Sequence, residues 1–185
     1  MNPSNDSVDA VIQGCSESCR RLLAVARALT PKQYGERWRN RNGIGPHLRH
    51  CYEHLTALMD GMESGVVSYD ARERNLLLEQ DPQIFIDAML PVAAWIESLN
   101  TSDLDTPLIV CQIPHVDVPE VRSSSTLQRE LLFLTSHTIH HLAIVSMLAE
   151  LHGAVVPDDL GVAYSTTTHE HQQQHIVGRQ NAVTT

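Results

Sequence analysis

The chain has 185 residues, of which 42% are hydrophobic, and this is enough for one compact domain with an ordinary core. Lys and Arg total 13 against 22 Asp and Glu, and the resulting net charge of −9 disfavours a nucleic-acid partner, because an acidic surface repels phosphate. The N-terminus lacks the basic and apolar regions of a signal peptide, and no run approaches the roughly 18 apolar residues that span a bilayer. We therefore expect a cytoplasmic protein with no membrane partner.

Apolar residues at helical spacing predict four long helices, at about residues 6–29, 43–65, 82–99 and 125–152. Thr30-Pro31 ends the first helix and begins a short turn, and Gly65 ends the second. Asp81-Pro82 is a good start for the third helix. Ser125 with Gln128 fits a capping box for the fourth, which Gly153 closes.

The segments between these helices are of three kinds. Residues 69–80 form a charged connector, and residues 107–121 contain three prolines in an alternating apolar pattern that favours a short hairpin of edge strands. Residues 165–185 are rich in His, Gln and Thr, and we expect a polar, mobile tail there. The sequence thus predicts an all-α protein, a four-helix bundle at 1–164 with a short β-hairpin between the third and fourth helices.

The four cysteines lie at positions 15, 19, 51 and 111, with no CxxC pair among them. Cys15 and Cys19 are one helical turn apart, where a disulfide is strained. We therefore expect four buried free thiols in a reducing compartment.

Histidine is unusually frequent, with eleven residues. His137 and His141 are four residues apart in the fourth predicted helix, so they stand on the same face. Leu134 and Val145 lie on that face too, which turns both imidazoles toward the core. Two buried imidazoles without partners are costly to desolvate, and metal coordination removes this cost.

A third ligand should come from a facing helix. His47, His50 and His54 of the second predicted helix share one sector about 60° wide, and their spacing alone does not choose among them. Three histidines with an open position are typical of catalytic zinc. The alternative is that these are surface or hydrogen-bonded histidines on amphipathic helices.

Two motifs resemble the DinB-like superfamily of four-helix metalloproteins: residues 44–54 (IGPHLRHCYEH) and 136–141 (SHTIHH). The resemblance implies metal ligands at His50, His137 and His141. Three imidazoles suit zinc, nickel, iron and copper alike, and we expect a divalent ion, with zinc first and nickel or iron next. A small-molecule substrate such as a low-molecular-weight thiol is expected, and a homodimer by analogy with the family.

The function implied by this resemblance is that of a metal-dependent enzyme, a thiol S-transferase or a hydrolase. A zincin-type protease is disfavoured, because Thr138 occupies the position of the HExxH glutamate. The alternatives are a non-catalytic metal- or ligand-binding bundle, such as a stress-response protein, and a purely structural helical adaptor.

Several side chains are candidates for orienting the metal ligands. They are His47, His54, His140 and Glu130. Glu130 lies two turns before His137, although an exposed helix glutamate is the commoner case. Asp70, Arg72 and Arg74 can close over the bundle mouth and bind an anionic group, but we favour a solvated charged loop for them.

Overall fold

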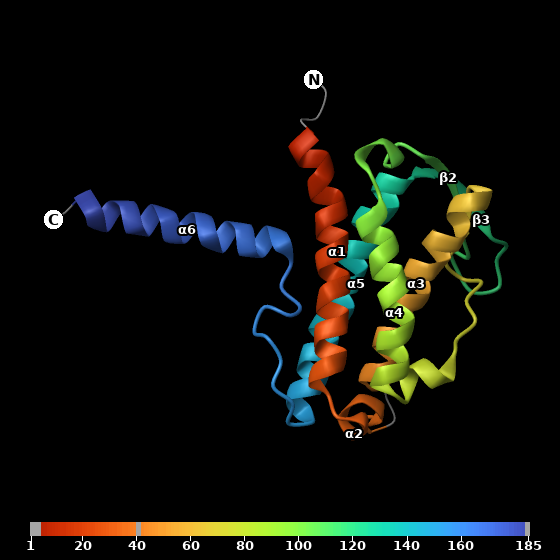
Figure 1. Cartoon of the computed structure of the whole chain (residues 1–185), viewed down its shortest axis with the longest axis horizontal. Helices are drawn as coiled ribbons and strands as arrows, with labels where there is room; N and C mark the ends of the chain where they lie inside the picture. The colour runs from red at the N-terminus through yellow and green to blue at the C-terminus, as the bar shows by residue number, and fades with distance from the viewer. Residues whose placement is uncertain (1–4, 40–41, 184–185) are drawn as a thin grey trace.

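The structure is a computed structural model, and it describes residues 5–39 and 42–183. The described chain is mainly helical with one small sheet, which confirms the expected helical class (Figure 1). In chain order the elements are α1 (Asn5–Ala28), α2 (Pro31–Gly35), α3 (Ile44–Ser64), β1 (Val66–Ser68), η1 (Leu76–Glu79), α4 (Pro82–Ser98), η2 (Thr101–Asp103), β2 (Pro107–Gln112), β3 (Val121–Thr126), α5 (Leu127–Leu151) and α6 (Tyr164–Val183).

Helices α1, α3, α4 and α5 build the body of the molecule. α1 packs against α4 and α5, and α3 packs against the same two helices, so an apolar core fills the space among them (Figure 1). Fully buried leucines from α1, α3 and α5, for example Leu22, Leu55 and Leu142, contribute to it. Burial of such side chains contributes about 1.5–3 kcal/mol each relative to exposure. This packing holds α3 and α5 side by side.

The helix ends follow local signals, with one correction. Gly65 has a left-handed φ of 69° at the end of α3, and the Asp81 side chain accepts the Gln83 N–H at the start of α4. The cap of α5 is Thr126, whose hydroxyl accepts the Arg129 N–H, and not the predicted Ser125. The Ser125 hydroxyl donates to the Glu130 carboxylate instead, and Thr126 directly precedes Leu127, the first residue of the helix.

The sheet has the order β1-β2-β3. β2 and β3 are antiparallel, from Pro107 opposite Thr126 to Gln112 opposite Val121, which confirms the predicted hairpin. β1 pairs with β2 in parallel, with Val67 opposite Val110, and this short strand was not predicted. β3 runs directly into α5, because Thr126 ends the strand and Leu127 begins the helix.

In the described part of the chain, the α-helices α2 and α6 lie outside the predicted ones. α2 occupies the turn after Pro31, where the Thr30 side chain and Gln33 form a capping box. α6 covers residues expected to be loop or tail, and it leaves the packed helices and runs outward (Figure 1). The Tyr164 hydroxyl, at the start of α6, donates to the Gly14 carbonyl at 3.2 Å.

Helix α5 meets the length and composition of a membrane span, with a mean hydropathy of 1.4 over its best window. The expectation that no stretch approaches this criterion was therefore wrong. The same window is 44% buried inside the protein, and α5 packs against α1 and α3. A helix that packs in a protein core is apolar because it is buried there, so the hydropathy of α5 does not show whether it meets a membrane.

The connector at residues 69–80 lies close along α3. A Cβ atom on Gly45 would stand 2.1 Å from the Glu79 carbonyl oxygen, so the two backbones are in direct contact. Arg49 Nε lies 2.8 Å from the Glu79 carboxylate and joins the same two elements. The connector is thus fixed against the helix that carries three of the candidate histidines.

Candidate metal centre

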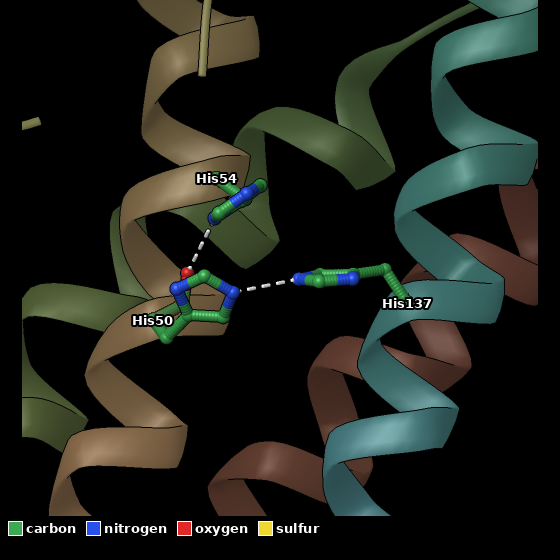
Figure 2. Close-up of side chains that lie close together, drawn as sticks. All are labelled: His50, His54 and His137. Carbon is green, nitrogen blue, oxygen red and sulfur yellow. Dashed lines mark hydrogen bonds between the residues drawn. The ribbon is translucent and has the colours of Figure 1, made fainter. Parts of the chain in front are cut away.

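Three imidazoles from two helices meet between α3 and α5. His50 and His54 come from α3 and His137 from α5, and their candidate ligand atoms all lie within 4.8 Å of one another. The Nε2 atoms of His50 and His137 are 2.9 Å apart, across the gap between the helices (Figure 2). Histidines of the second and fourth predicted helices are thus in contact, as the spacing argument requires.

His141, implied as a ligand by the resemblance, lies beside this trio. Its ring centroid is 4.6 Å from those of both His50 and His137. Its Nδ1 atom faces another imidazole, that of His47, with 2.9 Å between the two Nδ1 atoms. Both His54 and His141 therefore stand next to the His50–His137 pair, and the choice of His141 as third ligand stays a prediction.

These imidazoles are held in the neutral form. Burial, followed by the charges of neighbouring histidines, lowers the pKa of His50 to about 2 and that of His141 to about 3. Burial also lowers the pKa of His54 to about 4, and it lowers the pKa values of His47 and His137. A neutral imidazole keeps a lone pair for a metal ion, so coordination at neutral pH requires no deprotonation.

The hydrogen bonds assign protons to the ring nitrogens. His54 Nδ1 lies 2.9 Å from the His50 carbonyl oxygen and 3.3 Å from Arg72 Nη1 (Figure 2). The shorter contact, to a carbonyl that can only accept, makes Nδ1 the donor and leaves the lone pair on Nε2. Arg72 Nη1 donates to His50 Nδ1, because a guanidinium has donors only. His50 therefore carries its proton on Nε2 and donates it to His137 Nε2. Within the trio, His50 Nε2 is therefore protonated, and the lone pair of His137 Nε2 accepts its hydrogen bond.

Arg72 joins the connector to this centre. Its side chain is only 14% exposed, and Nη1 lies 3.8 Å from Glu53 Oε2. Its Nε atom is buried and meets no acceptor in the part of the chain that the structure describes. The favoured interpretation of residues 70–74 as a solvated charged loop is therefore wrong for Arg72.

Glu130 contacts the histidine cluster through Tyr69. It is fully buried, which corrects the expectation of an exposed helix glutamate. Its carboxylate accepts hydrogen bonds from the Tyr69 hydroxyl at 2.7 Å, from Arg129 Nη1 at 2.8 Å and from the Ser125 hydroxyl. The Tyr69 ring stacks on His54, with centroids 5.3 Å apart and planes 12° from parallel. Glu130 therefore positions His54 through Tyr69.

The donor set fits a divalent transition-metal ion. Zinc binds imidazole nitrogen at about 2.0–2.1 Å, which sets ligand nitrogens about 3.4 Å apart in a tetrahedron. The His50 and His137 nitrogens are within a few tenths of an ångström of that spacing, so small side-chain shifts suffice. The neutral His50 ring must change tautomer before a metal can bind at Nε2, so that its single proton moves from Nε2 to Nδ1.

The remaining candidates lie at the margin of the centre or outside it. His140 is exposed, and its ring centroid is 5.4 Å from that of His141. Cys51 is buried beside His50 in the chain but belongs to the core, and all four cysteines are free and buried, as expected. The contacts of Arg72 and Tyr69 with the histidines were not predicted. The sequence signal that could have indicated these contacts is the charged connector at residues 69–80, which carries both residues.

The comparisons with known proteins give one partial likeness. FK506-binding protein 5 of Rhizopus delemar is 32% identical to this chain over 109 residues, which are 58% of the chain and 28% of that protein. Because the chain spans little more than a quarter of the relative's length, the match does not show a family. No family model and no solved structure matches the chain.

Proposed function

We propose that this chain is a divalent-metal-binding protein of the DinB-like four-helix type. Its ion is held by His50, His137 and a third histidine from α3 or α5, which is His141 by resemblance or His54 by the distances. The observation that carries the proposal is the 2.9 Å approach of two Nε2 atoms from separate helices, among imidazoles kept neutral by burial. Three imidazoles suit zinc, nickel and iron alike, and we put zinc first.

We further propose a metal-dependent enzyme, a thiol S-transferase or a hydrolase, acting on a small molecule. Bound to three imidazoles, a zinc ion supplies an acidified water or a deprotonated thiol. The protein's own residues keep the imidazoles neutral and orient them, His54 through Tyr69 and His50 through Arg72. The alternative is a non-catalytic metal-binding bundle, in which protein side chains occupy every coordination position of the ion and leave none for water or substrate.

Metal content of purified, untagged protein tests the site. We expect about one equivalent of zinc, lost in His50→Ala and in His137→Ala because each variant removes one side of the inter-helix pair. The His140→Ala variant is the matched control, because its exposed ring lies outside the trio. Comparing His54→Ala with His141→Ala identifies the third ligand as the variant that loses more zinc. Full zinc content in His50→Ala contradicts the proposal.

The same protein preparations distinguish a metal-dependent enzyme from a non-catalytic metal-binding bundle. An enzyme site keeps an exchangeable water on the ion, and chelation abolishes turnover. Substitution of zinc by cobalt reports the number of ligands through its absorption spectrum. A closed four-ligand spectrum that small thiols leave unchanged favours the non-catalytic alternative.

A further inference from the structure

We infer that His47 is a positioning residue of the metal centre, which accepts a hydrogen bond from His141 and thereby keeps His141 Nε2 available to the ion. This inference rests on the proposed function, in the form in which His141 is the third ligand. Its starting point is the contact between α3 and α5 at which the Nδ1 atoms of His47 and His141 stand 2.9 Å apart.

The contact between these two rings holds one proton. Its distance is that of a hydrogen bond, so one Nδ1 atom donates and the other accepts. A neutral imidazole carries a single proton, on either Nδ1 or Nε2. Two arrangements satisfy the contact: His141 donates from Nδ1 and keeps its lone pair on Nε2, or His47 donates and the His141 proton lies on Nε2. Only the first arrangement leaves His141 Nε2 able to bind a metal.

A metal ion at His141 Nε2 therefore selects the first arrangement. Coordination fixes the remaining proton of His141 on Nδ1, and a metal-bound histidine normally gives this proton to an acceptor that orients its ring. Among the described residues, the hydrogen bond to His47 is the only one that the His141 ring makes. His47 thus already occupies the place of this acceptor.

The spacing of the rings agrees with His141 as a ligand. Zinc binds imidazole nitrogen at about 2.0–2.1 Å, so the ring centroids of ligands in a tetrahedron lie about 5 Å apart. The His141 centroid is 4.6 Å from those of both His50 and His137, which are themselves 5.0 Å apart. These three rings can therefore surround one ion while His141 keeps its contact with His47.

Nitrogen NMR of the ¹⁵N-labelled full chain, loaded with zinc, tests the positions of the protons. We expect His141 to show a metal-bound Nε2 and a protonated Nδ1. His47 should carry its proton on Nε2 and show an unprotonated, hydrogen-bonded Nδ1. A role of His47 in helix packing alone would not fix these protons. A zinc-loaded protein in which His47 is protonated at Nδ1, or is itself bound to zinc, overturns the inference.

Two substitutions of His47 separate its acceptor nitrogen from its shape. Asparagine places an amide oxygen near the position of Nδ1, whereas leucine fills the space without an acceptor. We expect His47→Leu to weaken zinc binding about 10–100-fold, the range in which such outer partners act, and His47→Asn to keep most of the affinity. His140→Leu is the matched control, because its ring is exposed and makes no hydrogen bond with His141 among the described residues. Competition with a chelating dye measures the affinities.

The outcomes of these measurements separate the inference from the proposed function. Unchanged zinc affinity in His47→Leu overturns the inference alone, and so do equal losses in His47→Leu and His47→Asn. A His141→Ala variant with full zinc content also overturns it alone, because His54 is then the third ligand. Absence of zinc binding by the native protein overturns the metal site and the inference together. Urea unfolding of the metal-free variants checks that each one folds, and the NMR measurement on the native protein does not depend on them.

Discussion

The hydroxyl of Tyr69 connects a fully buried carboxylate to the histidines. It donates to Glu130 Oε2 at 2.7 Å, and its ring stacks on His54. Burial, together with this hydrogen bond to Glu130, raises the pKa of Tyr69 far above its usual value, so the hydroxyl keeps its proton at every physiological pH. Tyr69 therefore acts only as a donor to Glu130.

Removing the Tyr69 hydroxyl measures how much its hydrogen bond contributes to the free energy of unfolding. We expect Tyr69→Phe to lower the free energy of unfolding of metal-free protein by about 1.5–3 kcal/mol, because a buried charged acceptor loses one donor. Urea denaturation measures the change. Tyr164→Phe is the control: its half-buried hydroxyl donates to the neutral Gly14 carbonyl, and the expected loss is about 1 kcal/mol. Equal losses would contradict a special role for the Glu130 bond.

At this scale the sequence predicts what helical spacing determines. The inward face of His137 follows from the four-residue interval to His141 and the leucines around it. The contact of Arg72 with His50 could not be predicted, because a connector's path depends on long-range packing and not on local periodicity. The choice between His54 and His141 depends on distances that no spacing rule contains.

At the scale of the elements, the backbones of α3 and the connector are in direct contact at Gly45. Any larger residue there would collide with the Glu79 backbone, and the connector would have to move. The same connector carries Arg72, whose guanidinium contacts His50 in the histidine cluster.

A matched pair of glycine variants tests this approach. Gly45→Ala is expected to lower the free energy of unfolding by about 1–3 kcal/mol through overpacking against backbone. Gly14→Ala, within α1, meets only ordinary contacts at 3.6 Å or more, and helix propensity should stabilise it by up to about 1 kcal/mol. Thermal and urea unfolding measure both. A stabilised Gly45→Ala would mean that the connector is free to move away.

The long helices were predictable because glycine, proline and capping residues mark their ends locally, as Asp81-Pro82 does for α4. Strand β1 could not be predicted, because three residues are too few for a periodic pattern and their pairing with β2 is long-range. Helix α6 was missed because its sequence has no apolar stripe.

For the whole molecule, the histidine cluster makes stability depend on pH. In the folded protein the pKa values of His50, His54 and His141 lie at about 2, about 4 and about 3, below the unfolded value near 6.5. Below pH 6.5 the unfolded chain therefore binds more protons than the folded chain, and folding stability falls as pH falls.

Thermal unfolding of metal-free protein between pH 7.5 and 4.5 measures this dependence. We expect the free energy of unfolding to decrease on the order of 1 kcal/mol per pH unit for each neutral histidine below pH 6.5. The His50→Ala variant should show a shallower decrease, because one such group is gone. A flat profile in the native protein would show that the imidazoles titrate freely.

The placement of the thiols has a consequence for oxidation. Cys15, Cys19, Cys51 and Cys111 all lie in the interior, so folded copies present no sulfur to one another or to a dissolved oxidant. Intermolecular disulfides therefore require the helices to separate first, and the thiol chemistry of this chain is limited by how often it opens.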